Sequence, residues 1–547
     1  MNRLRLPPTR AILLLLLLTG GLYGCAHLLR HSAYMGVTVD PDRLHRIETL
    51  DLDAMSAAPQ ADEEQPSPLE APAEVSLSIE QCRAAALQNN LDLKVQLLSP
   101  AIARQSVHEE LARFEALFLA NASRAWSDTP TSTTLSGSQG ETFSGDAGLQ
   151  FPLITGGSVA LDVPVSRTET DNAFATLNPS YSADFAVSIS QPLLRGAGPR
   201  ANTHAIRVAH YQSQIIDAQT KLEVIRVIAA VDRVYWRLYA ARKQLEVRKQ
   251  QYDLAVAQLE RARRQVEAGT VSEVEIIRAE AGVAEQLEAI ILADNAVRDR
   301  QRDLKRVIQK SDLPMSGPTT VVPVTEPNPL HYQLDADRLV AAAVDSRMEM
   351  LELELQLATD ASSISYQRNQ LLPLVTLDYT YNVNGLGPTA ADAFDLMLEN
   401  RFIDHRVGLS VQVPLGNEAA KAQLRRAVYE RLQRLATRSQ REAQIEQETL
   451  SAIDQLEANW QRIAASGRAA VLAARNLAAE QRQFEIGLRT STDVLDAQTR
   501  LADAQSAEVL ALTEYEIAQV DIAVATGTLL GAADVRWAPT EPVDNVR

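Results

Sequence analysis

Three short blocks of this sequence occur twice, in the same order, and this duplication restricts the possible folds more than any other feature. The blocks, each with its copy, are Ala84–Ala86 and Ala341–Ala343, Pro192-Leu193 and Pro414-Leu415, and Gly269 and Gly487. Each glycine is followed at equal spacing by a hydroxyl residue, an acidic residue and an alanine. Self-similarity over this length indicates one structural unit used twice.

Each unit has the pattern of a helix, a β segment, a long helix, a glycine tip and a second helix. Neither long helix has a proline to stop it, since none occurs between Pro199 and Pro314 or between Pro414 and Pro539. Apolar residues recur at a spacing of seven, which is typical of a left-handed coiled coil. They are Val224, Val231, Leu238, Leu245, Tyr252, Leu259 and Val266 in the first unit, and Leu456, Ile463, Ala470, Leu477 and Phe484 in the second.

The length of these helices already limits the function. They should run from about residue 201 to 268 and from about 417 to 486, so that each reaches about 100 Å at a rise of about 1.5 Å per residue. Such a length suits a duct that crosses a periplasm. A soluble coiled-coil rod would have the same helices, so the β segments must distinguish the two.

The β segments alternate between apolar and polar residues with a period of two. The apolar positions include Val375, Leu377, Tyr379 and Tyr381, then Val407, Leu409, Val411 and Val413, and in the first unit Phe185, Val187 and Ile189. Strands of about ten residues with one apolar face form the wall of a transmembrane β-barrel. An ordinary soluble sheet with one buried face gives the same alternation, and both remain open at this point.

The N-terminal residues predict export and an anchor. Arginines at positions 3, 5 and 10 precede the apolar run 11–18, which is the layout of a secretory signal and is too short to span a bilayer. The following Leu22–Cys25 is similar to a bacterial lipobox with Cys25 as the lipidated residue, although Tyr23 is larger than usual. The alternative is a cleaved signal with an incidental thiol. Residues 51–74 are rich in Ala, Pro, Asp and Glu and predict a tether.

The order and spacing of several motifs resemble the TolC family of outer-membrane efflux proteins. They are Leu372-Pro373, Gln191–Leu194, Val413–Leu415, the first tip Val266–Ser272 and the second tip Phe484–Ala497. The resemblance runs from roughly Val75 to Ala532. It implies a mainly α fold with a membrane β-barrel portion, built from two internal repeats. Three protomers would form a trimeric α-helical barrel of long coiled-coil helices and share one outer-membrane β-barrel.

One departure from the family pattern lies in the first unit. The family has two strands per unit, whereas this unit has β-like runs near 117–126, 146–153, 158–166 and 181–191, with a turn at Gly156-Gly157. The additional hairpin could extend an extracellular loop, add a layer or enlarge the barrel. A count of four strands per protomer is therefore in doubt.

The resemblance also assigns a pore constriction to the second tip. Asp493 and Asp496 are three residues apart on a helix, so they share a face, and they match positions at which the family forms rings of carboxylates. Arg489 matches a residue that holds the family's tunnel closed. The first-unit counterparts are Glu275 and Arg278, which offer opposite charges between tips. Without the resemblance, the two aspartates would be read as solvated surface residues.

The tips are also the expected docking surface for a periplasmic adaptor. The candidates are Gly269, Thr270, Val271 and Ser272 in the first tip, and Gly487, Leu488, Arg489 and Thr490 in the second. Both glycines would permit the sharp turn between helices. Helix punctuation alone would explain them equally well.

Other classes of function find little support. A net charge of −17 disfavours nucleic acid, which is held by clusters of Lys and Arg. The eight histidines lack metal-ligand spacing and no nucleophile motif occurs, so we expect no catalytic residue, no metal and no cofactor. Cys82 lies in a helical apolar pattern and should be a core residue.

The sequence therefore predicts an outer-membrane channel of a tripartite export system, with its helical barrel in the periplasm. It would be a homotrimer that conducts substrate passively from an inner-membrane pump and a periplasmic adaptor. The alternative is a lipid-anchored periplasmic coiled-coil scaffold or adaptor without a pore. The expected segments are a signal peptide (1–24), a lipid-anchored tether (25–75), the first repeat (76–313), a linker (314–335), the second repeat (336–533) and a tail (534–547).

Overall fold

The computed structural model describes residues 74–132 and 137–536. These residues belong to one compact unit, Pro72–Arg547. The expected signal peptide, Cys25, all but the last two residues of the expected tether, and most of the tail lie outside the described residues. None of the described helices is both long enough and apolar enough to cross a membrane.

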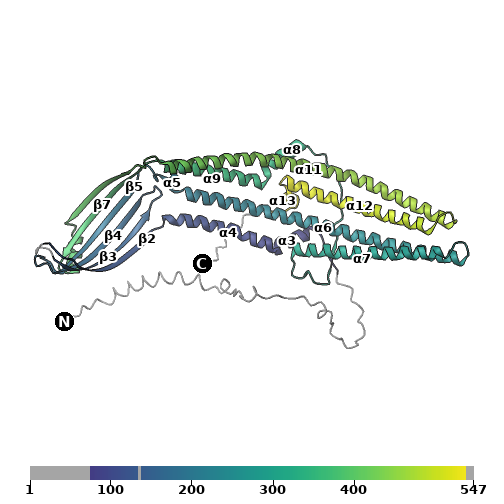
Figure 1. Ribbon diagram of the computed structural model, residues 1–547, viewed down its shortest axis with the longest axis horizontal. Helices are drawn as coiled ribbons and strands as arrows, with labels where there is room; N and C mark the ends of the chain where they lie inside the picture. Colours follow the sequence, from purple (N-terminus) through teal and green to yellow (C-terminus); the bar gives the residue numbers. More distant parts are fainter. Residues whose placement is uncertain (1–73, 133–136, 537–547) are drawn as a thin grey trace, which may run out of the picture. The chain divides into compact units, whose positions relative to one another are not determined.

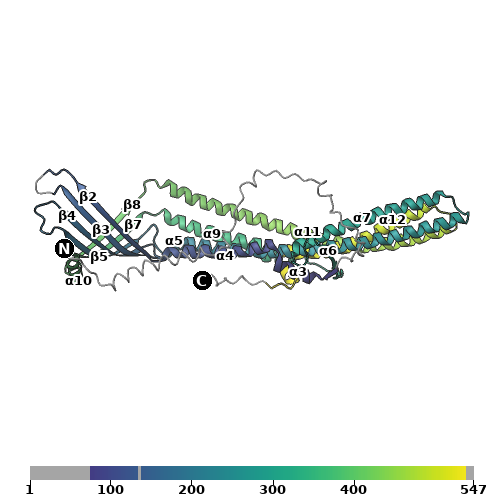
Figure 2. The ribbon, with the colours of Figure 1, turned by 90° about the horizontal axis from the view of Figure 1, so that it is seen from below.

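Two long helical hairpins extend through the unit (Figure 1). The first consists of α6 (His204–Glu267) and α7 (Val274–Ile308), and the second of α11 (Glu418–Glu485) and α12 (Ser491–Ala525). Helix α6 has 64 residues and α11 has 68, so they are about 96 and about 102 Å long. The predicted pair of equivalent long helices is confirmed, and each hairpin ends in a tip at the far end from the sheet (Figures 1 and 2).

The seven-residue seam supplies much of the core. Val224, Val231 and Leu238 of α6 are at most 4% exposed, and Leu456 and Phe484 of α11 are similarly buried. Fixed spacing works here because side chains seven apart return to one face of the helix. The α6 positions join the largest apolar cluster, which also contains Cys82 as the sequence predicted. Burial raises the pKa of the Cys82 thiol to about 12.

The opening helix of each repeat is broken into two, at equivalent positions. In the first repeat α3 (Ile79–Asn89) gives way to α4 (Leu91–Leu111) at Asn90, and in the second α8 (Ala336–Ser346) gives way to α9 (Met348–Gln370) at Arg347. The Asn90 side chain caps α4 and donates Nδ2 to the carbonyl of Val307 in α7 at 2.9 Å. Each break thus faces a long hairpin.

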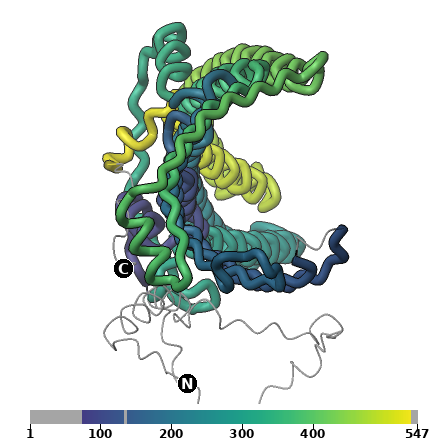
Figure 3. Tube along the Cα trace, turned by 90° about the vertical axis from the view of Figure 1, so that its left-hand side faces the viewer, coloured from purple at the N-terminus to yellow at the C-terminus, as the bar shows by residue number. Residues whose placement is uncertain are grey.

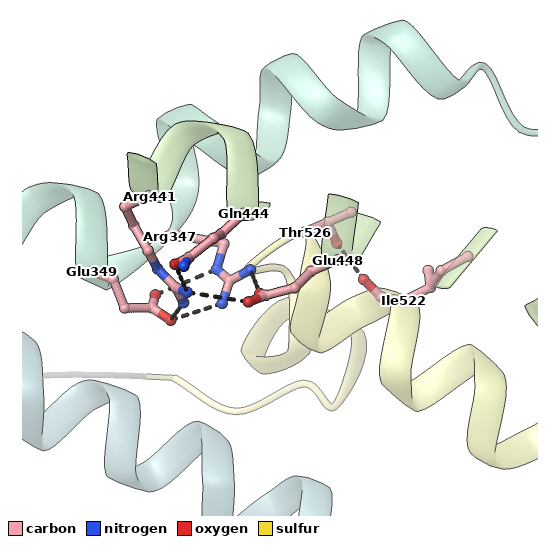
Figure 4. Close-up of polar contacts among 7 residues, drawn as sticks. All are labelled: Arg347, Glu349, Arg441, Gln444, Glu448, Ile522 and Thr526. Carbon is pink, nitrogen blue, oxygen red and sulfur yellow. Dashed lines mark hydrogen bonds and ion pairs between the residues drawn. The ribbon is translucent and has the colours of Figure 1, made fainter. Parts of the chain in front are cut away.

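Arg347 makes the corresponding contact in the second repeat through an ion-pair network (Figure 4). The side chain of Arg347 is 9% exposed and pairs with Glu349 at 2.8 Å and with Glu448 of α11. Arg441 completes the network, since it lies 3.0 Å from Glu349 and 3.1 Å from Glu448. Four charged groups therefore fix the α8–α9 corner against α11.

All six long strands form one antiparallel sheet at the end opposite the tips. The sheet order is β2 (Leu117–Asp128), β3 (Gln139–Pro152), β4 (Ser158–Thr170), β5 (Ser180–Pro192), β7 (Leu374–Gly387) and β8 (Ile403–Gln412). The additional hairpin of the first repeat is β2–β3, and it extends this same sheet. The glycine turn between β3 and β4 is confirmed, since Gly156 has φ of +90°. Within the described residues this sheet has six strands, where the family pattern gave four.

The strand register gathers apolar side chains into rows across the sheet. Val159 lies opposite Ile189, Ile189 opposite Tyr379, and Tyr379 opposite Val407. Polar partners occupy the alternate positions, as where Ser190 donates to Asp378 at 2.7 Å. In this row Val407 is 71% and Ile189 is 40% exposed, whereas Val159 and Tyr379 are half-buried. A one-sided soluble sheet would bury such a row beneath a second layer, so the exposed row favours a sheet that faces an apolar medium.

Viewed along the long axis, the sheet and the adjoining helices bend into an arc that is open on one side (Figure 3). The strands at the two edges, β2 and β8, each have one side that pairs with no other strand in the part of the chain that the structure describes. Every residue of β2 is exposed. Both edges are therefore available for pairing.

A short parallel strand pair lies near the middle of the unit and was not predicted. Strand β1 (Glu74–Leu77) pairs with β6 (Thr320–Pro323), which falls within the expected linker. The pair is fixed to α6, because the Tyr235 hydroxyl donates to the carbonyl of Leu77 at 3.2 Å and accepts from the amide of Thr325 at 2.8 Å. The connection between the repeats is thereby joined to the start of the first repeat.

Candidate functional site at the helix tips

Both hairpins turn through the same local geometry. The first tip (residues 268–273) joins α6 to α7, and the second tip (residues 486–490) joins α11 to α12. Gly269 has φ of +69° and Gly487 has φ of +76°, in the left-handed region that favours glycine. In each tip the backbone N–H of the residue after the glycine closes a Schellman motif. Thr270 donates to the carbonyl of Gln265, and Leu488 donates to the carbonyl of Gln483, both at 2.9 Å. The predicted glycine turns are confirmed.

Thr490 and Asp493 together cap the helix that follows the second tip. The Asp493 carboxylate accepts from the backbone N–H and from the hydroxyl of Thr490, both at 2.9 Å, and the Thr490 side chain in turn accepts from the Asp493 N–H. This is a capping box, which satisfies amides that the helix itself leaves unpaired. The hydrogen bond from the Thr490 backbone lowers the pKa of Asp493, as do the nearby Arg489 and Arg278. Asp493 is therefore ionised at neutral pH.

Asp496 and Arg489 lie on either side of this cap. Asp496 is exposed one turn further along α12, and among the described residues it forms no ion pair. Arg489 reaches back to α11, where its Nε lies 2.9 Å from Gln483 Oε1 and 3.1 Å from a carboxylate oxygen of Glu480. Within one chain, Arg489 thus fastens the second tip to its own long helix.

Glu275 connects the first tip to the second. It is 9% exposed, and its carboxylate accepts from the backbone N–H of Ser491 at 2.8 Å and from Arg278 at 2.6 Å. Ser491 is the first residue of α12, where the N–H has no partner within the helix. A residue of the first repeat therefore caps a helix of the second, and the negative charge matches the positive end of that helix.

A second close contact between α7 and α12 lies further from the tips. A Cβ placed on Gly282 of α7 would lie 2.6 Å from the nearest side-chain carbon of Leu495 in α12. A larger side chain at this position would have to displace the end of the Leu495 side chain. Glu275 and Gly282 together hold α7 against α12.

An open groove of about 610 Å³ lies between the tips. Three of the docking candidates line it, namely Thr270, Val271 and Gly487. Its charged lining residues are Arg261, Arg264 and Glu485. Ile486, which also lines the groove, is 70% exposed, and Leu488, the residue after Gly487, is 71% exposed. Exposed apolar side chains around a groove are typical of a surface that binds another protein.

The structure therefore brings the predicted site residues together, with a division of tasks that the sequence did not indicate. Glu275 and Asp493 follow their tip glycines at equal spacing, yet Asp493 caps its own helix and Glu275 caps the helix of the other repeat. The roles of Glu480 and Gln483 as partners of Arg489 were also missed. The positions of these two residues along α11 do not indicate this role, because the contacts form only when the second tip folds back against α11.

An exposed apolar row at one end, helices of about 100 Å and paired hairpin tips at the other end define the class of duct-forming outer-membrane proteins. Comparison with known proteins gives the family. The family model described as "Outer membrane efflux protein" matches residues 158–308 and 339–528, which is more than half of the chain. This chain belongs to the outer membrane efflux protein family. Strands β2 and β3 precede the first matched residue.

A curated relative and several solved structures agree with this assignment. The outer membrane protein TolC of Vibrio cholerae is 22% identical over 349 residues, covering 63% of this chain and 76% of the relative. The outer-membrane channel OprN superposes with a TM-score of 0.60 at 14% identity, covering 82% of this chain and 90% of that structure. For the CmeC outer membrane channel of Campylobacter jejuni the TM-score is 0.61 at 13% identity, covering 82% and 86%.

The predicted family, mainly helical fold and two-repeat organisation are thus confirmed. The protein is an outer membrane efflux channel, and its family is one of transport proteins without enzymatic activity. The alternative of a scaffold without a pore is not supported by this family membership.

Proposed function

We propose that this chain is the outer-membrane duct of a tripartite export system. Three copies would form one channel, and their helix tips would meet a periplasmic adaptor that connects the duct to an inner-membrane pump. One observation carries this proposal. The same chain combines an apolar row across the sheet with two hairpins whose glycine tips lie one helix length, about 100 Å, from the sheet.

The free edges of the sheet support closure between copies. An unpaired edge exposes N–H and C=O groups to pairing with another chain, and a closed barrel removes such edges. We infer that β2 of one protomer pairs with β8 of the next. Because each chain supplies six strands and barrel diameter grows roughly in proportion to strand number, the opening would be about one and a half times as wide as with four.

The tips would form the constriction and the docking surface. Around a threefold axis Asp493 and Asp496 would each become a ring of carboxylates that focuses a negative field on the aperture. Arg489, which matches the position that the family uses to hold its tunnel closed, would restrain the closed state. The groove at Thr270, Val271 and Gly487 would receive the adaptor.

Cys25 would carry the lipid that anchors the N-terminus in the outer membrane.

Cross-linking between strand edges tests the trimeric duct. Phe118 of β2 and Val411 of β8 are 69% and 60% exposed. A Phe118→Cys, Val411→Cys variant in a Cys82→Ser background should yield covalent trimers with a bifunctional maleimide. The matched control replaces Ile189 of β5 instead of Phe118, and an interior strand should give no such product. Equal cross-linking by both variants, or a monomer without conductance in planar bilayers, would contradict the proposal.

A further inference from the structure

A second concave site lies about the middle of the unit, away from the tips. It is an open cavity of about 820 Å³ between α6, α7 and the chain that leads into β6. The lining contains three acidic residues but six basic ones. The basic residues are Arg242, Lys243, Lys249, Arg298, Arg302 and Lys305. The whole chain carries a net charge of −17. A concentration of positive charge in so acidic a protein calls for a local explanation.

Lys305 is the innermost of these basic groups. It is 4% exposed, and its Nζ donates to the carbonyl of Gly317 at 3.1 Å. Among the described residues, no carboxylate lies within ion-pair distance of it. Burial lowers the pKa of Lys305. A buried ammonium without a counter-ion is costly, and an anion in the cavity would offset that cost.

Two further polar groups at the cavity lack a partner. Gln301 lies one turn before Lys305 on α7, so the two share a helix face, and Gln301 is 7% exposed. Its Nε2 is buried without a hydrogen-bond partner among the described residues, and so is the hydroxyl of Thr320 in β6. Buried donors are nearly always satisfied in folded proteins. Three donors from two elements therefore point to a missing acceptor.

The rim adds groups suited to oxyanions. Arg298 and Arg302 pair with Asp294 and Asp299 at 2.8 Å, but these arginines are 67% and 59% exposed. Exposed pairs of this kind contribute little, so either guanidinium can turn to a ligand. The planar fork of arginine matches a carboxylate or a phosphate with two parallel hydrogen bonds.

We propose that this cavity binds a polyvalent anion with phosphate or carboxylate groups. Lys305, Gln301 and Thr320 would form its floor, and Arg298 and Arg302 its rim. The volume accommodates a molecule of several heavy atoms, well beyond a single ion. Because the lining comes from α6, α7 and the segment between the repeats, a bound anion would also fasten that segment to the first hairpin.

Calorimetric titration of the purified full-length protein in detergent tests this site. The probes are inorganic pyrophosphate for phosphate chemistry and citrate for carboxylate chemistry. Lys305→Met keeps the side-chain length and removes the charge, and it should raise Kd by about tenfold or more because a charge-assisted hydrogen bond is lost. Gln301→Leu should raise Kd several-fold, and Lys305→Arg should restore part of the affinity. Whichever probe binds more tightly identifies the ligand chemistry.

The matched control is Arg300→Gln, which removes one positive charge from an exposed position of α7 outside the cavity lining. It should leave Kd within about twofold, since exposed charges act weakly at a distance. Pyrophosphate should also raise the Tm of the wild type by more than that of Lys305→Met. If Lys305→Met fails to fold, Gln301→Leu carries the comparison.

Two results would overturn the proposal. The first is no binding of either probe at millimolar concentration. The second is an equal Kd in the wild type, Lys305→Met and Gln301→Leu, which would mean diffuse surface attraction.

Discussion

Replacing Glu275 by Ala should loosen the start of α12 without unfolding the protein. Glu275 belongs to the first repeat, and its carboxylate lies 2.8 Å from the amide of Ser491 in the second. That amide is the first of its helix and has no acceptor within the helix, so its protection from hydrogen exchange depends on Glu275. The variant removes this acceptor and also the partner of Arg278.

The expected magnitude follows from the burial and charge of the contact. Removing an N-cap acceptor costs about 1 kcal/mol, and a hydrogen bond to a charged group contributes about 1.5–3 kcal/mol. Glu275 is 9% exposed, so solvent screens the contact only weakly. Taking about 2 kcal/mol, exchange of the Ser491 amide should accelerate about 30-fold.

Hydrogen–deuterium exchange of peptides that span residues 488–494 measures this effect. Glu275→Gln keeps an acceptor oxygen but not the charge and should give an intermediate rate. Glu285→Ala, at an exposed position of the same helix, is the matched control and should leave exchange unchanged. If Glu275→Ala exchanges at the wild-type rate, the two tips are held by other contacts and the reasoning fails.

Four other expectations concern the tips and the anchor. Replacing Asp493 and Asp496 together by Ala should weaken cation selectivity and trivalent-cation block in planar bilayers while the trimer persists; unchanged block would place the constriction elsewhere. Because the pKa of Asp493 is lowered from 3.8, its cap should be present above that value and lost as pH falls through the lowered pKa. Pepsin cleavage at the second tip should then quicken in strong acid, and Asp493→Asn should abolish that dependence. Gly282→Ala should press on Leu495 and lower Tm by a few degrees. Cys25→Ser should abolish fatty-acid labelling; retained label would refute the anchor.

Features that depend on local sequence could be predicted well. The long helices, their seam and the turns at Gly269 and Gly487 follow from spacing, from the absence of proline and from the conformational freedom of glycine. The strand runs were found from their period-two alternation, although β3 begins earlier and β4 ends later than the apolar residues suggested. Polar residues continue both strands, because neighbours in the sheet supply the hydrogen bonds.

Features that depend on distant parts of the chain could not be predicted. Asn90 and Arg347 break their helices because each side chain finds a partner on a long hairpin, at Val307 and Glu448. Nothing in the residues next to Asn90 encodes that partner. The same holds for Glu275, whose acceptor role requires the second tip to be in place. At the candidate site, sequence therefore gave the residues but not their pairing.

The parallel pair of β1 and β6 has a consequence for the order in which the chain can fold. Val75 lies opposite Val321, so the pair closes a segment that contains the whole first hairpin and four of the six long strands. Because synthesis proceeds from the N-terminus, β1 is made early but has no partner until β6 has been made. Closing so long a segment is entropically slow. The first repeat can therefore complete its native contacts only after the connection to the second has been made, and a chain truncated before β6 should remain a target for proteases.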